Sequence, residues 1–271
     1  MKLGISSYSY GWSIGKAGYP KEMKTFSCMD LIRKAVDLKI FLVQIADNLP
    51  LHKQTEKELI ELKDLSEEYG ISLETGTKGI DTAHIQKYID ISTFLNSSIL
   101  RCVIDTAENK PTPEETIVQL EKLVPFLERS QVKLAIENHD RFTADTLNYI
   151  LDRIDTNFIG ICYDTANSFG CLEGPMEVLE KLENKIINVH IKDIKVDRLP
   201  HKYGFTIYGS PAGYGQLDIK AIINKLRSIK SDPNVILELW TPPEQNMDQT
   251  VKKEQEWVRK SIMQLRKIIK Q

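Results

Sequence analysis

Short apolar runs alternate with longer amphipathic segments along the whole chain of 271 residues. The short runs are rich in Val, Ile and Leu, as expected for parallel strands that are covered on both faces. They predict strands at Leu3–Ser7, Phe41–Ile45, Ser72–Glu74, Ile99–Ile104, Val132–Asn138, Phe158–Tyr163, Ile187–Ile191 and Val235–Leu239.

The segments between these runs carry apolar residues at helical spacing. They predict helices at Met29–Asp37, Thr55–Tyr69, Ala83–Leu95, Pro113–Glu128, Thr143–Ile154, Pro175–Leu182, Leu217–Ile229 and Val251–Ile269. Eight strands that are each followed by a helix, in a chain of this length, predict a (β/α)8 TIM barrel. A doubly wound open sheet is the alternative, and it is disfavoured because no GxGxxG follows the first strand. No linker-like segment interrupts the pattern, so we predict a single domain over residues 1–271.

The longest stretch without a predicted element runs from Ile194 to Gln216 and contains GFTIYGSPAGYGQ. A loop of this length in a compact domain usually has a function. We therefore expect an irregular loop that acts as a lid over the substrate.

Polar residues with metal-binding side chains lie near the C-terminal ends of the last four apolar runs. They are Glu137 in VKLAIEN, Asp164 in FIGICYD, His190 in IINVHIKD and Glu238 in NVILELW. Charged groups in such segments are unfavourable unless they are paired or bind a metal. A helix cap or an ion pair with a lysine would explain any one of them. In a barrel, however, consecutive strand ends converge on one face. Three carboxylates and one imidazole can bind a divalent metal, so we predict one ion, with Mn²⁺ preferred over Mg²⁺, Co²⁺ or Zn²⁺.

Two cationic residues also lie within or directly after predicted strands. Arg101, between Leu100 and Cys102, is expected to point into the barrel, where it would bind a substrate carboxylate or phosphate, or form a buried ion pair. Lys192 follows His190 by two residues and shares its strand face, so it could polarise a substrate oxygen or pair with a carboxylate. Further candidates for substrate binding are Gln44, Glu74, Lys78, His139 and Arg198.

Composition and charge narrow the class of protein. The formal net charge is -2 and the isoelectric point is about 6.3, so the basic surplus of a nucleic-acid-binding protein is missing. No apolar run approaches the length of a membrane span. The four cysteines have no CxxC spacing, which suits a reducing compartment, and the N-terminus reads as a strand. We predict a cytoplasmic protein with no nucleic-acid or membrane partner; homo-oligomers remain open.

The strand-end residues, with YDTAN, HIKD and a GxGxxD motif, resemble the xylose isomerase-like TIM-barrel superfamily over essentially the whole chain. The GxGxxD residues are Gly213, Gly215 and Asp218. This group includes sugar isomerases and epimerases and the endonuclease IV branch. The resemblance implies that Glu137, Asp164, His190 and Glu238 bind one divalent metal. It also implies that Glu137 and Glu238 form an acid/base pair. Many relatives have a histidine where this chain has Asn167, which can bind a substrate hydroxyl but cannot act as a base.

These features favour a metal-dependent isomerase or epimerase of a small keto-sugar, sugar acid or polyol derivative. Glu137 and Glu238 would move protons while the metal stabilises an enediolate. The alternative is a lyase, because decarboxylation of a 3-oxo sugar acid also produces an enediolate. Lys192, Arg101 or Arg198 would then hold the carboxylate. An endonuclease IV type of enzyme would need more histidines than the five present, and a non-catalytic sugar-binding barrel is the fourth hypothesis.

Overall fold

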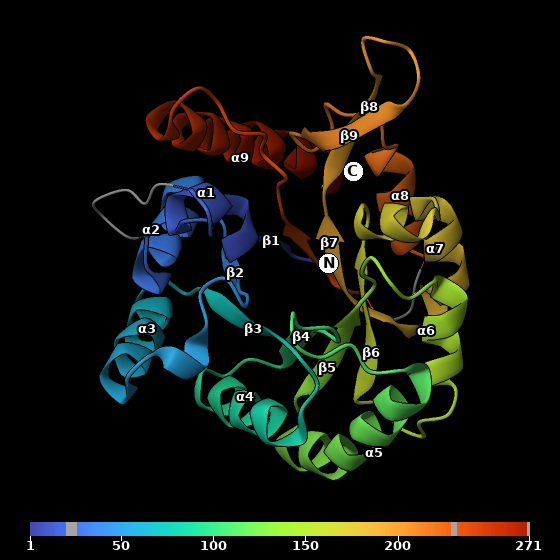
Figure 1. Ribbon diagram of the computed structural model, residues 1–271. Coiled ribbons are helices and arrows are strands. Elements are labelled where there is room, and N and C mark those ends of the chain that lie inside the picture. The colour runs from blue at the N-terminus through green and yellow to red at the C-terminus, as the bar shows by residue number, and fades with distance from the viewer. Residues whose placement is uncertain (20–25, 229–231, 270–271) are drawn as a thin grey trace.

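The computed structural model describes residues 1–19, 26–228 and 232–269. Eight parallel strands close into a barrel that is surrounded by helices (Figure 1). Around the barrel the order is β1-β10-β7-β6-β5-β4-β3-β2. The strands are β1 (Leu3–Ser6), β2 (Leu42–Ile45), β3 (Ser72–Lys78), β4 (Ile99–Val103), β5 (Lys133–Glu137), β6 (Ile159–Asp164), β7 (Ile186–Ile191) and β10 (Asn234–Leu237). The predicted (β/α)8 barrel is confirmed.

The predicted helices are also present, with ends that differ by a few residues. They are α2 (Cys28–Leu38), α3 (Glu56–Glu68), α4 (Thr82–Phe94), α5 (Pro113–Ser130), α6 (Ala144–Leu151), α7 (Pro175–Leu182), α8 (Ile219–Leu226) and α9 (Met247–Ile269). Ile229, the predicted end of α8, lies outside the described residues. A single-turn helix α1 (Gly11–Ile14) and the 3₁₀ turns η1 (Ser7–Tyr10), η2 (Leu51–Lys53), η3 (Asn167–Cys171) and η4 (Glu183–Lys185) were not predicted. No helix among the described residues is both long and apolar enough to cross a membrane.

The barrel has an apolar exterior and a partly polar interior. Outward-facing strand residues and the surrounding helices form a continuous buried cluster that includes Val43, Leu134 and Ile161. Inside the barrel lie Gln44 and Asn188, which are both fully buried. Barrel interiors are usually filled by branched apolar residues. The buried polar residues below the candidate site therefore depart from the usual apolar filling of a barrel.

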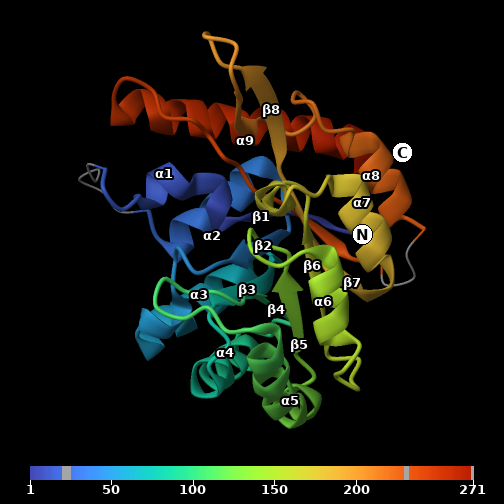
Figure 2. The same ribbon diagram turned by 45° about the vertical axis from the view of Figure 1, so that its right-hand side comes forward.

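The prediction of an irregular loop after β7 was wrong. Residues Asp193–Arg198 (β8) and Phe205–Ser210 (β9) form an antiparallel hairpin. The hairpin projects beyond the ring of helices in both views (Figures 1 and 2). Its strands were missed because β8 alternates apolar residues with exposed charged ones such as Lys195 and Asp197, so it lacks the apolar run of a barrel strand.

Asp193, at the base of this hairpin, anchors the loop that leads to α8. Its carboxylate accepts hydrogen bonds from the backbone N–H groups of Gly213, Gly215 and Leu217 at 2.9, 2.8 and 3.2 Å. A Cβ atom at Gly215 would lie 2.1 Å from Asp193 Oδ1, so only glycine allows this approach. The last residue of HIKD thus binds the two glycines of GxGxxD, while Asp218 caps α8 by accepting from the N–H of Ala221.

We expect Asp193→Ala to lower the free energy of unfolding by about 2–4 kcal/mol, because several backbone N–H groups lose a charged acceptor. Urea denaturation followed by circular dichroism measures this change. Asp197→Ala is the matched control, since the Asp197 carboxylate lies on the exposed part of the same hairpin and accepts from Tyr208. It should change stability by no more than about 0.5 kcal/mol. Equal stability of the two variants would contradict the anchoring role.

Candidate active site

Four side chains converge where β5, β6, β7 and β10 end. Glu137 and Asp164 are the last residues of β5 and β6, His190 is the penultimate residue of β7, and Glu238 follows β10. These strands are consecutive neighbours in the barrel, so their carboxyl ends meet. All four residues are at most 2% exposed. The structure therefore brings together the residues that the sequence pattern singled out.

The imidazole of His190 lies at the centre of this group. Its Nδ1 atom is 3.2 Å from Glu137 Oε2, 3.4 Å from Glu238 Oε1 and 3.7 Å from Asp164 Oδ2. Its Nε2 atom lies 2.7 Å from Gln44 Oε1. One ring nitrogen thus bonds to a neutral amide inside the barrel, and the other faces three carboxylates.

The chemistry of these donors fits a divalent cation. His190 Nδ1 and Glu238 Oε1, which face each other, are buried atoms without a hydrogen-bond partner among the described residues. Imidazole nitrogen and carboxylate oxygen are suitable ligands for Mn²⁺, Mg²⁺, Co²⁺ and Zn²⁺. Residues Asp164, His190 and Glu238 offer ligand atoms that lie within 4.8 Å of one another, and Glu137, Cys162 and His190 form a second such group.

Two buried cations contact the proposed metal ligands. Arg101 Nε donates to Glu137 Oε2, and Arg101 Nη1 donates to Asp47 Oδ1 at 2.8 Å. Lys192 Nζ lies 2.6 Å from Asp164 Oδ2 and 2.9 Å from Glu238 Oε2. Both therefore form ion pairs, which was one of the two alternatives for each residue. When Asp47 and its neighbour Lys78 are included, four carboxylates face three cations, so the group is net negative with a neutral His190, and a divalent ion would add positive charge to it.

The charges of these groups are set by competition between burial and their neighbours. Burial alone would raise the pKa of Glu137, but Arg101 and His190 hold it well below its usual range. Burial likewise acts to raise the pKa of Asp164, and Lys192 lowers it. For His190 burial lowers the pKa, yet Cys162, Glu238 and Glu137 raise it well above its ordinary value. The group therefore favours ionised carboxylates around a positive charge.

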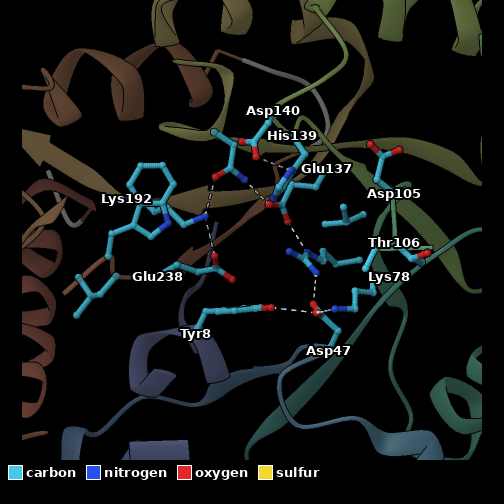
Figure 3. Close-up of a pocket in the computed structure, with 16 residues that line it drawn as sticks. Tyr8, Asp47, Lys78, Asp105, Thr106, Glu137, His139, Asp140, Lys192 and Glu238 are labelled. Carbon is cyan, nitrogen blue, oxygen red and sulfur yellow. Dashed lines mark hydrogen bonds and ion pairs between the residues drawn. The ribbon is translucent and has the colours of Figure 1, made fainter. Parts of the chain in front are cut away.

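A cavity of about 420 Å³ opens above these residues (Figure 3). Glu137, Glu238, Lys192, Tyr8, Asp47 and Lys78 surround it, with Glu137 facing Asp47 and Lys78 across the cavity (Figure 3). Its lining also includes the predicted substrate-binding residues Arg101, His139 and Asn167. The amide of Asn167 donates to Glu137 Oε1 at 2.6 Å, and its oxygen accepts from Lys192 Nζ at 3.2 Å. A cavity of this size suits a small, polar molecule.

Three predicted substrate-binding residues do not line this cavity. Gln44 and Glu74 are buried inside the barrel, where they bond to each other. Arg198 lies on β8, donates to the carbonyl of Lys202 and stacks over Phe205, because the hairpin carries it away from the barrel. No residue of the hairpin lines the cavity in the described part of the chain, so the expected lid is not found there.

Asp47 was missed by the sequence analysis. Its carboxylate accepts from Tyr8 Oη at 2.9 Å and from Arg101, and it lies 3.7 Å from Lys78 Nζ. It follows β2 by two residues, so the strand-end rule used for Glu137 could have found it.

The chain belongs to the xylose isomerase-like TIM barrel family, whose sequence model matches residues 32–261. It is 28% identical over 262 residues to a 3-oxo-isoapionate decarboxylase from Pectobacterium atrosepticum, covering 97% of this chain and 94% of the relative. Its fold is similar to a D-psicose 3-epimerase from Clostridium cellulolyticum H10, with a TM-score of 0.75, 14% identity and 99% of each chain covered. A family protein from Mycobacterium smegmatis in complex with magnesium gives a TM-score of 0.71, 14% identity and 97% coverage of each chain.

The endonuclease IV hypothesis required several histidines at one metal site. Within the part of the chain that the structure describes, both candidate metal-binding groups contain His190 and no other histidine. His52 and His84 lie against Tyr88, and His201 lies beside Tyr203. His139 lines the cavity but belongs to neither metal-binding group, so among the described residues His190 is the one histidine that these groups contain.

Proposed function

We propose that this protein is a divalent-metal-dependent lyase that decarboxylates a small 3-oxo sugar acid. The observation that carries the proposal is that two buried cations, Arg101 and Lys192, line the same cavity as Glu137 and Glu238. A carboxylate substrate would find cationic partners there, whereas a neutral sugar has no need of them. The metal would be held by Glu137, Asp164, His190 and Glu238. The lyase was the alternative to an isomerase or epimerase in the sequence analysis.

Decarboxylation of a 3-oxo acid needs an electron sink and a proton donor but no base. The bond to the carboxylate carbon breaks, CO₂ leaves, and the electron pair passes into the carbonyl group. A proton then returns to the carbon that lost CO₂. A bound divalent ion would supply Lewis-acid stabilisation of negative charge on the carbonyl oxygen.

The contacts of Glu137 suit a ligand better than a base. Its Oε2 accepts from Arg101 Nε, and its Oε1 accepts from the Asn167 amide. Both oxygens are therefore engaged, which disfavours proton abstraction from carbon. An epimerase would need two carboxylates that exchange protons on opposite faces of the substrate.

The two cations would have different roles. Arg101 donates through Nε to Glu137 and through Nη1 to Asp47 and the carbonyl of Thr77, while its Nη2 has no hydrogen-bond acceptor among the described residues. We assign this nitrogen to the substrate carboxylate. Lys192 Nζ would donate the proton that returns to carbon. Lys192 Nζ also lies 5.4 Å from the centre of the Trp240 ring, which lines the cavity beside it.

The similarity to the 3-oxo-isoapionate decarboxylase supports this choice. That protein is 28% identical across nearly the full length of both chains, whereas the D-psicose 3-epimerase is 14% identical. The carboxylate of a 3-oxo sugar acid would have Arg101 and Lys192 as cationic partners in the cavity. We therefore infer a branched or linear 3-oxo sugar acid as the substrate class.

The decisive experiment incubates purified protein and Mn²⁺ with 3-oxo sugar acids, including 3-oxo-isoapionate, in ²H₂O. We expect CO₂ release, one deuterium in the product, and loss of activity on EDTA treatment that Mn²⁺ restores. Inactive 3-oxo acids together with solvent exchange into a keto-sugar would overturn the decarboxylase proposal. CO₂ release that survives metal removal would overturn the metal dependence.

An isomerase or epimerase, the leading hypothesis from the sequence, is the second candidate. Glu137 and Glu238 are both buried and both line the cavity, as an acid/base pair would require. Exchange of a substrate C–H proton without CO₂ release would favour this reaction. If the only detectable sugar binding survives Glu137→Gln and Glu238→Gln, the non-catalytic barrel is favoured instead.

A further inference from the structure

We propose that Glu74 is a positioning residue for the metal centre. Acting through Gln44, its carboxylate would hold His190 as the Nε2–H tautomer and leave Nδ1 free to bind the ion. The inference rests on the metal site of the proposed function, but it does not depend on which reaction that site catalyses. It gives a role to a buried charge that the proposed reaction does not use.

Glu74 lies on β3 inside the barrel and is 3% exposed. Its Oε2 atom accepts from Gln44 Nε2 at 3.1 Å and from Asn188 Nδ2 at 2.9 Å. Its Oε1 atom accepts from Asn234 Nδ2 at 2.8 Å. Three amide groups from three other strands therefore donate to one carboxylate.

The register of the strands places these side chains in one layer. Gln44 pairs with Glu74 across β2 and β3, and Asn188 pairs with Asn234 across β7 and β10. His190 follows Asn188 by two residues, so its side chain points into the barrel one layer nearer the cavity. Gln44 spans the two layers, because its amide contacts Glu74 on one side and His190 on the other.

The carboxylate determines the direction of each hydrogen bond. Glu74 accepts from three amide NH₂ groups and donates to none of the described residues, so Gln44 presents its NH₂ group to Glu74. The same NH₂ group also donates to Asn188 Oδ1 at 3.1 Å. Oε1 of Gln44 is then left as an acceptor 2.7 Å from His190 Nε2, and that nitrogen must carry the proton.

This tautomer is the one that the metal site needs. With the proton on Nε2, the lone pair of Nδ1 points toward Glu137, Asp164 and Glu238. In the other neutral tautomer a hydrogen atom on Nδ1 would occupy the place of the ion. Partners that orient a ligating histidine in this way typically raise metal affinity.

We call the chain of hydrogen bonds from Glu74 through Gln44 to His190 the relay. Glu74→Gln tests it because the substitution keeps the size of the side chain but replaces one carboxylate oxygen with an NH₂ group, which is a donor. Gln44 can then reverse its amide, present NH₂ to His190, and favour the Nδ1–H tautomer. We expect the affinity for Mn²⁺, measured by isothermal titration calorimetry, to fall by about 10- to 100-fold. The ¹⁵N shifts of labelled His190 should report the change of tautomer.

Glu254→Gln is the matched control. Glu254 is another buried carboxylate, 2% exposed, and it accepts from the backbone N–H of Trp12 and from the backbone N–H and hydroxyl of Ser13. Replacing Glu254 removes a buried carboxylate, but Glu254 contacts none of the proposed metal ligands. We expect lower thermal stability and an unchanged affinity for Mn²⁺.

A second variant tests whether Glu74 acts through Gln44. Gln44→Leu removes the link between Glu74 and His190, so adding Glu74→Gln to it should lower the affinity for Mn²⁺ no further. A further loss of similar size would overturn the relay, as would Glu74→Gln with unchanged affinity and an unchanged tautomer.

Two measurements on the wild-type protein, the tautomer of His190 and the binding of Mn²⁺, distinguish a failure of the relay from a failure of the proposed reaction. In metal-free protein at a pH high enough to make His190 neutral, an Nδ1–H tautomer would overturn the relay even if no variant folds. Failure to bind Mn²⁺ would overturn both the metal site and the relay, whereas Mn²⁺ binding without decarboxylation would overturn only the reaction.

Discussion

Replacing Lys192 with Met is expected to lower kcat for CO₂ release by about 10²–10⁴-fold, the usual contribution of a general acid. The affinity for Mn²⁺ should be no weaker than in the wild-type protein. Lys192 Nζ contacts Asp164 Oδ2 and Glu238 Oε2, two atoms that would also face the ion. Removing this cation makes the net charge of the site more negative by one, which favours the binding of a divalent ion. Activity and metal affinity should therefore change in opposite directions.

The two quantities are measured by CO₂ release at saturating Mn²⁺ and by calorimetric titration of Mn²⁺. Lys195→Met is the matched control, because Lys195 is an exposed residue of β8 on the hairpin. It should leave both quantities unchanged. A Lys192→Met protein that binds Mn²⁺ poorly but turns over at the normal rate would contradict the role of proton donor.

The barrel could be predicted because each of its strands interrupts a helical pattern with a short apolar run. Glu137 and Glu238 stood out for the same reason, since each is a charge at the end of such a run. The hairpin β8–β9 carries no apolar run, because it leaves the barrel and exposes alternate residues such as Lys195. Sequence patterns that depend on burial cannot detect a strand pair that is largely solvated.

The interior network could not be predicted, because it depends on strand order and register. Asn234 Nδ2 binds Glu74 although 160 residues separate them in sequence. Glu74 and Gln44 were read as substrate groups, since nothing local in SLETG or LVQI indicates a buried amide layer. For Arg101 the sequence left two roles open, and the register that pairs it with Ala135 places Glu137 within reach of its guanidinium.

Replacing Asp164 with Asn is expected to lower the affinity for Mn²⁺ by at least about 100-fold, the upper end of the effect of losing an indirect partner of a metal ligand. The two oxygens of Asp164 have separate partners. Oδ1 accepts from the backbone N–H groups of Ala166 and Asn167 at 2.8 and 2.9 Å, whereas Oδ2 faces Lys192 Nζ and His190 Nδ1. Asparagine can keep the first pair with its oxygen, but it presents an NH₂ group where the ion and Lys192 need an acceptor.

The fold should therefore survive while the metal site is lost, and activity should fall with metal occupancy. Far-UV circular dichroism, calorimetric titration of Mn²⁺ and CO₂ release measure the three quantities. Asp218→Asn is the matched control, because Asp218 also accepts a backbone N–H at 2.9 Å but does so at the start of α8. Asparagine caps helices about as well as aspartate, so this control should retain both metal affinity and activity. If Asp164→Asn bound Mn²⁺ as tightly as the control, Oδ2 would not be a ligand, and the ion would have to be placed on Glu137, Cys162 and His190 instead.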